Sequence, residues 1–207
     1  MPTAIEFSDA TRHLVRIAAA VAGAAAGVTR RVMTEANGNV EGVAVDEVLL
    51  QSYLFAGFPR TLNATAIWRE ISGTMAPAED VLASADRFAE WQAAGDLACR
   101  RVYGPVYQTL RDNVRALHPA LDAWMLVDGY GKVLSRPALD LILRELCIVA
   151  ACAASDQQPQ LRSHLRGALN CGATRDHLAH TLAALTDVIS LDAMTAAREQ
   201  LSRLKEL

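Results

Sequence analysis

Residues 144–154 have the sequence RELCIVAACAA, and residues 12–22 have the related sequence RHLVRIAAAVA. Both stretches contain Arg-x-Leu followed by alanines at matching positions, and the match continues beyond them. The later aligned positions are Ala36 with Ala168, Gly42 with Gly172 and Asp46 with Asp176, after two extra loop residues in the first stretch. A length change confined to a turn is typical of a duplicated unit, because loops absorb insertions at little cost. Chance identity is the alternative in an alanine-rich chain, but the matches at Arg, Leu, Gly and Asp favour two diverged copies.

The composition favours an all-α fold. Of the 207 residues, 52% are hydrophobic and only 5% are aromatic, so the core must consist mainly of Ala, Leu, Val and Ile. Alanine is the best helix former, and no segment shows the sustained alternation typical of a strand. The helices predicted from apolar periodicity, caps and breakers span 10–35, 45–56, 60–71, 78–101, 104–117, 120–127, 138–154, 157–170, 174–189 and 191–207, with a turn at 128–131.

The predicted domain organisation follows from the duplication. The stretch SGTMAP at 72–77 is the clearest linker in the chain. We therefore expect a degenerate first repeat at 1–75, a helical connector at 76–135 and a second repeat at 136–207. A unit of about 70 residues buries little surface alone, so the two copies are expected to pack together as two subunits of an oligomer would.

Charge and apolar patterning exclude several partners. The net charge is -3 and no block of like charges occurs, so neither nucleic acid nor an anionic membrane surface is an expected partner. The apolar stretch at 17–28 is too short to span a bilayer, and no signal peptide precedes it. We expect a soluble, cytoplasmic protein.

The four cysteines of the chain have no spacing typical of a redox or metal site. They are Cys99, Cys147, Cys152 and Cys171, and none forms a C-x-x-C or a zinc pattern. Buried, reduced thiols are the expectation, because a free cysteine behaves as a small hydrophobic residue. We predict neither a metal nor a cofactor.

Glu145 and His164 are the candidate catalytic residues. Each belongs to a largely apolar predicted helix, and a Glu–His pair is a usable acid–base couple near neutral pH. At the aligned positions the first copy has His13 and Val32, which cannot form such a pair. A site is therefore predicted only in the second copy.

Three motifs carry a resemblance to a known family. Arg144-Glu145-Leu146, Gln160-Leu161-x-x-His164-x-x-x-Ala168 and Gly172-Ala173-Thr174 resemble the carboxymuconolactone decarboxylase family and its alkylhydroperoxidase-D-like relatives. The resemblance is clearest over 136–188 and weaker over 11–71. It implies two tandem alkylhydroperoxidase-D-like helical units packed together.

The same resemblance argues against peroxidase chemistry. The peroxidase relatives have a Glu, then a C-x-x-C pair, then a His, and Glu145 and His164 match the outer positions. The thiol positions are occupied by Gln157 and Gln160, which cannot form thiolates. The resemblance therefore implies the decarboxylase branch, a carboxy-lyase that acts without thiols or metals on a small cyclic carboxylate or lactone.

Roles follow for individual residues as hypotheses. His164 is the expected proton donor to the dienolate left by loss of CO2, and Glu145 is expected to orient it. Arginine binds carboxylates bidentately. The candidate substrate-binding residues are Arg136, Arg144 or Arg166 for the carboxylate, Tyr130 and Trp124 for an apolar wall, and Gln160.

Two alternatives remain open. Glu145 and His164 are equally consistent with a buried hydrogen-bonded pair between helices, in a non-catalytic helical oligomer that binds a small ligand or a partner protein. A thiol peroxidase that uses Cys147, Cys152 or Cys171 out of register is the other alternative. The resemblance implies a homo-oligomer, with a trimer and a dimer both allowed.

Overall fold

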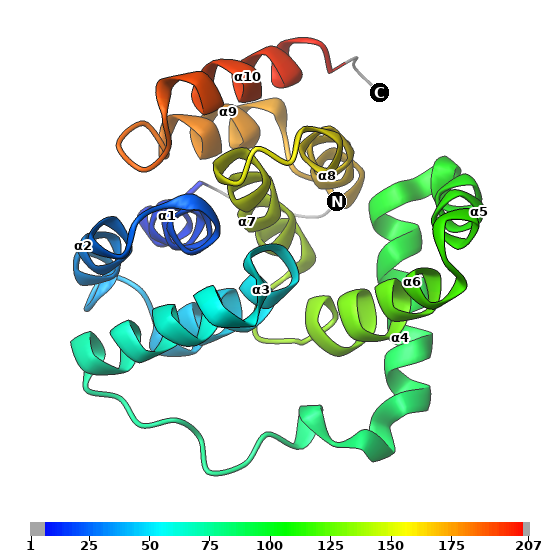
Figure 1. Cartoon of the computed structure of the whole chain (residues 1–207), viewed down its shortest axis with the longest axis horizontal. Coiled ribbons are helices and arrows are strands. Elements are labelled where there is room, and N and C mark those ends of the chain that lie inside the picture. The colour runs from blue at the N-terminus through cyan, green and yellow to red at the C-terminus, as the bar shows by residue number, and fades with distance from the viewer. Residues whose placement is uncertain (1–6, 205–207) are drawn as a thin grey trace.

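The computed structural model describes residues 7–204, and these form an all-α fold of two helical units packed together (Figure 1). No strand occurs among them, only an isolated bridge between Asn37 and Val40. The α-helices are α1 Asp9–Gly23, α2 Ala26–Ala36, α3 Gly42–Ser72, α4 Phe88–Tyr103, α5 Tyr107–Leu117, α6 Pro119–Trp124, α7 Leu141–Ala154, α8 Gln158–Cys171, α9 Arg175–Ala183 and α10 Leu191–Ser202. The short 3-10 helices η1 Val81–Ala83, η2 Ala85–Arg87 and η3 Gly104–Val106 and the π-helix η4 Met125–Leu134 complete the set.

The two units follow the same order of helices. Helices α1, α2 and the two halves of α3 follow one another in the same order as α7, α8, α9 and α10. This order is compatible with the predicted duplication. The domain boundaries at 75 and 135 stay a prediction.

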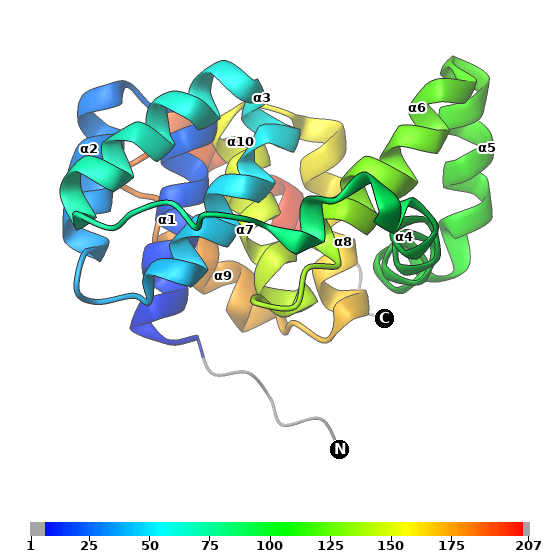
Figure 2. The same cartoon turned by 90° about the horizontal axis from the view of Figure 1, so that it is seen from below.

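Helix α7 lies at the centre of the molecule. Every residue from Arg144 to Ala153 is buried, and α7 contacts α1, α3, α8, α9 and α10. Figures 1 and 2 both show α1 and α2 on one side of it and α4, α5 and α6 on the other. A helix that is apolar on all sides is typical of a core position, and residues on α7 are therefore shielded by both units.

The helix predicted at 10–35 is wrong in one respect, because it divides into α1 and α2. The chain leaves the helical conformation at Ala24 and Ala25. Two side chains outside α1 hydrogen-bond to carbonyls in its last turn. Arg60 Nε donates to the Val21 carbonyl at 2.6 Å, and Thr29 Oγ1 donates to the Ala20 carbonyl at 3.2 Å. The Val21 carbonyl lies in the last turn of α1, where carbonyls have no partner within the helix, and Arg60 satisfies it. The Ala20 carbonyl also accepts from the Ala24 N–H at 3.0 Å.

The break predicted between 56 and 60 is a kink within one long helix, α3. Gly57 has φ 76° and ψ 162°, a conformation open to glycine but costly for other residues. Pro59 follows two residues later, in the first turn after the kink, where its missing N–H costs nothing. The kink turns the second half of α3 away from the first.

The turn predicted at 128–131 is wrong, because η4 continues through it. Gly131 and Gly95 instead allow η4 and α4 to cross very closely. A Cβ at Gly131 would lie 2.0 Å from the Trp91 carbonyl oxygen, and one at Gly95 would lie 2.1 Å from the Leu126 carbonyl oxygen. These glycines serve close packing rather than a turn.

The remaining differences concern helix ends. The segment predicted as the start of a helix at 78 forms η1 and η2, and α4 begins only at Phe88. Helix α7 begins at Leu141, after the Asp140 side chain caps it by accepting from the Leu143 N–H at 2.8 Å. Helix α9 ends at Ala183, and turns lead from there to α10.

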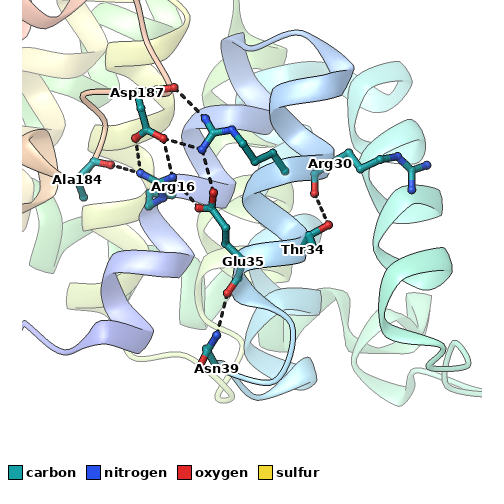
Figure 3. A network of polar contacts seen from close by, with 8 residues as sticks. Arg16, Arg30, Thr34, Glu35, Asn39, Ala184 and Asp187 are labelled. Atoms are coloured by element: carbon teal, nitrogen blue, oxygen red, sulfur yellow. Dashed lines mark hydrogen bonds and ion pairs between the residues drawn. The ribbon is translucent and has the colours of Figure 1, made fainter.

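An ion-pair cluster joins the first unit to the turn after α9 (Figure 3). The Arg16 guanidinium, which is buried on α1, donates to both carboxylate oxygens of Asp187, at 2.5 and 2.9 Å, and to Glu35 of α2 at 2.9 Å. Arg31 donates to Glu35 and to Asp187. The cluster fixes α1, α2 and the end of the second unit to one another.

None of the helices in the described part of the chain is both long enough and apolar enough to cross a membrane.

Candidate active site at Glu145 and His164

The structure brings Glu145 and His164 into direct contact inside the protein. Nδ1 of His164, on α8, lies 2.9 Å from Oε2 of Glu145, on α7. Glu145 is 0% exposed and His164 is 6% exposed. The other carboxylate oxygen, Oε1 of Glu145, is buried without a hydrogen-bond partner. An imidazole N–H facing a carboxylate satisfies one oxygen of a buried acid, which would be costly without a partner.

A glycine one turn after His164 makes room for this contact. A Cβ at Gly167 would lie 2.7 Å from Oε2 of Glu145 and 2.6 Å from Cγ1 of Val102. Any larger residue there would push α8 away from α7 and α4. Gly167 therefore sets the close approach of the helices that carry the pair.

Aromatic rings from two other parts of the chain flank the imidazole. The Phe55 ring, on α3, lies 6.0 Å from the His164 ring with the planes at 88°. The Tyr103 ring, at the end of α4, lies 6.4 Å away with the planes at 66°. The site is thus assembled from the first unit, the connector and the second unit together.

Tyr130 lies beside Tyr103, with their ring centroids 6.2 Å apart. Burial raises the pKa of both phenols, and the nearby Glu145 carboxylate raises the pKa of each further. Loss of charge through protonation is favoured where a group is desolvated beside an anion. Both phenols therefore stay protonated and can act as hydrogen-bond donors near the pair.

The thiols near the pair are unreactive by their environment. Cys99, Cys152 and Cys171 are buried free thiols, and burial together with the Glu145 charge raises the pKa of each to about 12. Burial likewise raises the pKa of Cys147 to about 12. Since the thiolate is the nucleophile, these sites do not suit peroxide chemistry.

The glutamines at the thiol positions are exposed. Gln157 and Gln160 lie at the start of α8. Gln160, a predicted substrate-binding residue, precedes His164 by one helical turn. Its role in substrate binding stays a prediction.

Two of the predicted carboxylate-binding arginines have a protein carboxylate as partner. Arg144 is 0% exposed and donates to Oε2 of Glu47 at 2.8 Å, and Arg136 donates to both Glu47 oxygens at 3.0 Å. Arg136 also pairs with Asp80 at 3.0 Å. Burial alone would raise the pKa of Glu47, but the two guanidiniums outweigh it and hold that pKa below its ordinary value. Arg144 therefore joins α7 to α3, and Arg136 joins α3 to Asp80 of the connector.

The two predicted aromatic wall residues lie in different environments. Tyr130 is buried, and its ring lies 6.2 Å from that of Tyr103. Trp124, at the end of α6, is 60% exposed.

A surface pocket of about 220 Å³ adjoins the site between α8 and the α4–α5 segment. Tyr103 is a lining residue of this pocket and also contacts His164. Its ring is therefore close to both the pocket and the imidazole.

The predicted pair is present, but sequence reasoning missed two of its neighbours, Phe55 and Tyr103. Each precedes a helix break, at Gly57 and at Gly104. A break indicates where a helix ends but not which distant side chain its last turn contacts.

The chemical capacity of the arrangement is proton transfer. The Glu145 carboxylate occupies Nδ1 of His164, so Nε2 is the nitrogen left to exchange a proton with another molecule. Within residues 7–204, no three His, Cys, Asp or Glu side chains are grouped so that they could hold a metal ion.

Residues 119–203 match the carboxymuconolactone decarboxylase family. The matched region runs from α6 to the end of α10 and includes both Glu145 and His164. The match leaves out Phe55 and Tyr103, the two rings that flank the imidazole.

Two curated relatives share sequence with the chain. Peroxisomal protein 2 of Schizosaccharomyces pombe is 33% identical over 135 residues, which cover 64% of this chain and 62% of the relative. Peroxisomal protein 2 of Saccharomyces cerevisiae is 27% identical over 164 residues, which cover 63% of this chain and 55% of the relative. The matched region thus spans about 60% of the length of these relatives.

Proposed function

We propose that the chain is a carboxymuconolactone decarboxylase-like protein that performs acid–base chemistry, without thiols, on a small cyclic carboxylate or lactone. The observation that carries the proposal is the 2.9 Å contact between His164 Nδ1 and Glu145 Oε2. The family match over the second unit supports it. The exposed glutamines at 157 and 160 and the raised thiol pKa values support a non-redox reaction.

The geometry supports a definite direction of proton transfer. Cleavage of the bond to the departing carboxylate releases CO2 and leaves its electron pair on the ring as a dienolate. Nε2 of protonated His164 donates a proton to the ring carbon, and water restores that proton afterwards. Glu145 holds Nδ1–H and stabilises the imidazolium, which is the usual task of a carboxylate behind a catalytic histidine.

The test is a direct assay of lactone decarboxylation by the wild type, His164→Ala and His180→Ala. A general acid contributes about 10²–10⁴-fold to a rate, so His164→Ala should lose at least about a hundredfold. His180 is exposed on α9, and its replacement should leave the rate unchanged. Absence of turnover by all three proteins, or equal turnover by all three, would refute the proposal.

A second candidate function is a non-catalytic helical protein that binds a small ligand or a partner. The full burial of Glu145 favours it, because a buried Glu–His contact also serves to join two helices. In that case His164→Ala lowers the free energy of unfolding and no lactone is decarboxylated. Urea unfolding of the same variant, measured beside the activity assay, separates the two functions.

The assembly and location of the chain are further proposals. We propose a homo-oligomer, a trimer or a dimer, and light scattering after size-exclusion chromatography measures it. The sequence predicts a cytoplasmic location, whereas the names of the two relatives support a peroxisomal one. Microscopy of a tagged chain beside a peroxisomal marker decides between these locations.

A further inference from the structure

Another pocket lies at the start of α4, away from the Glu145–His164 pair. Its volume is about 150 Å³, and a cavity of roughly that size holds a benzene molecule. Trp91 lines this pocket, whereas Tyr103, the α4 residue that contacts His164, lies near the other end of the helix. At 1.5 Å per residue, the two α4 positions are about 18 Å apart along the helix axis. The pocket is therefore separate from the candidate active site. Its lining residues are Leu82, Arg87, Trp91, Gly131, Lys132, Ser135, Arg136 and Pro137.

Every charged residue of this lining is a cation. Arg87, Lys132 and Arg136 line the pocket, and no carboxylate does. Arg136 is already held by the protein, because Glu47 and Asp80 together pair with all three nitrogens of its guanidinium. It therefore has little capacity to bind a ligand. The partners of a ligand must be the other two cations.

Lys132 is the cation of the lining that has no carboxylate partner. Its ammonium forms no ion pair with any residue between 7 and 204. Its nitrogen Nζ lies 5.2 Å from the centroid of the Trp91 ring, and the attraction between a cation and an aromatic face holds it at the pocket wall. An ammonium has three hydrogen-bond donors and no acceptor. Lys132 therefore offers both charge and donors to an anion.

Arg87 is a second cation that the protein does not saturate. Its ion pair with Glu90 is 2.6 Å long, but the two side chains are 35% and 63% exposed, and exposed pairs of this kind contribute little. Nε of Arg87 is buried without a hydrogen-bond partner. The guanidinium therefore keeps unused donors beside the pocket. A carboxylate suits such donors, because hydrogen bonds between ionised groups are the strong ones.

The rest of the lining suits a flat apolar body. The Trp91 Nε1–H donates to the Leu82 carbonyl at 3.2 Å, which fixes the indole against η1. Leu82, Trp91 and Pro137 together give the pocket an apolar surface. Aromatic rings pack favourably against an indole, and the volume limits the ligand to about one ring.

We propose that this pocket binds a single-ring carboxylate, with the carboxylate at Lys132 and Arg87 and the ring against Trp91 and Leu82. The assignment does not depend on acid–base chemistry at the distant Glu145–His164 pair. The lining comes from η1, η2, α4 and η4. A bound ligand therefore connects the segment before α4 to the π-helix η4.

The experiment measures binding of benzoate and of neutral benzyl alcohol to the full chain by calorimetry. Lys132→Met removes the charge and keeps an unbranched side chain. It should weaken benzoate binding about tenfold, the lower limit for a hydrogen bond to a charged group, because Lys132 is half-buried. It should leave benzyl alcohol binding unchanged. The matched control is Arg198→Met, at an exposed position of α10, which should bind both compounds like the wild type.

Two further variants locate the ligand. Ser135→Phe places a large side chain in the pocket from an exposed position and should abolish binding of both compounds. Bound benzoate should also change the tryptophan fluorescence of the wild type through Trp91. That change should disappear in Trp91→Phe, whereas binding measured by calorimetry should persist because phenylalanine keeps an aromatic ring.

Several outcomes would overturn the assignment. Benzoate that fails to bind the wild type at millimolar concentration excludes the site, and so does equal benzoate binding by Lys132→Met and Arg198→Met. Unchanged binding by Ser135→Phe, or a fluorescence change that survives in Trp91→Phe, places the ligand elsewhere. Thermal unfolding of each variant confirms that it is folded before binding is compared.

Discussion

Replacement of Glu47 by glutamine should destabilise the protein strongly. Glu47 is 4% exposed and is the carboxylate partner of Arg144, which is 0% exposed. It also pairs with Arg136 at 2.9 Å. Glu47→Gln keeps the size of the side chain but removes the negative charge that neutralises a buried guanidinium.

The magnitude follows from the burial of Arg144. Removal of one partner from a buried ion pair costs about 3–5 kcal/mol, because the other charge is left uncompensated. Arg144 keeps hydrogen bonds to the Arg136 carbonyl at 2.9 Å and to Gln51 Oε1 at 3.3 Å, and Arg136 keeps Asp80. The loss should therefore lie near the lower limit, at about 3 kcal/mol, out of a total that is typically about 5–15 kcal/mol.

Urea unfolding followed by circular dichroism measures the change in the free energy of unfolding. Glu70→Gln is the matched control, because Glu70 forms an ion pair with Arg30 at 2.6 Å but both side chains are exposed. Exposed pairs contribute little, and the control should unfold like the wild type. The double variant Glu47→Leu, Arg144→Met removes both charges and should recover most of the loss.

Two results would refute this reasoning. The first is a Glu47→Gln variant as stable as Glu70→Gln, which would mean that Arg144 finds other compensation. The second is a double variant that is less stable than the single one. In that case the polar contacts of Arg144, rather than its unpaired charge, would dominate.

Two further predictions concern packing and acid stability. Gly131→Ala should lower the free energy of unfolding by about 1–3 kcal/mol, because its Cβ would lie 2.0 Å from the Trp91 carbonyl oxygen. The control is Gly27→Ala, whose Cβ would have no atom within 4 Å. It should be neutral or stabilising in the same urea assay. Hydrogen bonds from Arg16 hold the pKa of Asp187 well below its ordinary value. The stability that Asp187 provides is therefore complete above about pH 4, its unfolded pKa, and is lost as the pH falls toward the lower folded pKa. Asp187→Asn should reduce the decline of unfolding free energy below pH 4, and an unchanged decline would contradict the prediction.

Much of the fold could be predicted from local sequence signals. Apolar periodicity located the helices, and the Gly57-Phe58-Pro59 break appears at the predicted position. The division between α1 and α2 could not be predicted from the alanine-rich run alone. Gly23 is the last residue of α1, and a Cβ there would lie 2.1 Å from the Ala154 carbonyl oxygen, a contact with α7 that one sequence does not show. The glycines at 129 and 131 suggested a turn, but Gly131 is required by the close crossing with α4.

The candidate site likewise combines features that the sequence indicates with contacts that depend on the packing of distant residues. The spacing of Glu145 and His164 identified a pair that is in contact in the structure, although its catalytic role stays a proposal. The contacts of Phe55 and Tyr103 depend on how three distant parts of the chain pack, and one sequence carries no signal for that. Arg144 shows that neighbours in sequence need not share a site. It is adjacent to Glu145 in the chain, but it points away from Glu145 around the helix and pairs with Glu47 of α3.

The burial of α7 on every side has a consequence for how the molecule unfolds. Because α7 contacts α1 and α3 of the first unit as well as α8, α9 and α10 of the second, neither unit can separate without exposing its apolar surface. The two units should therefore form one cooperative folding unit. Substitutions in α1 or α3 of the first unit should therefore also disturb the packing of α7, a helix of the second unit, even though the first unit has no acid–base pair of its own.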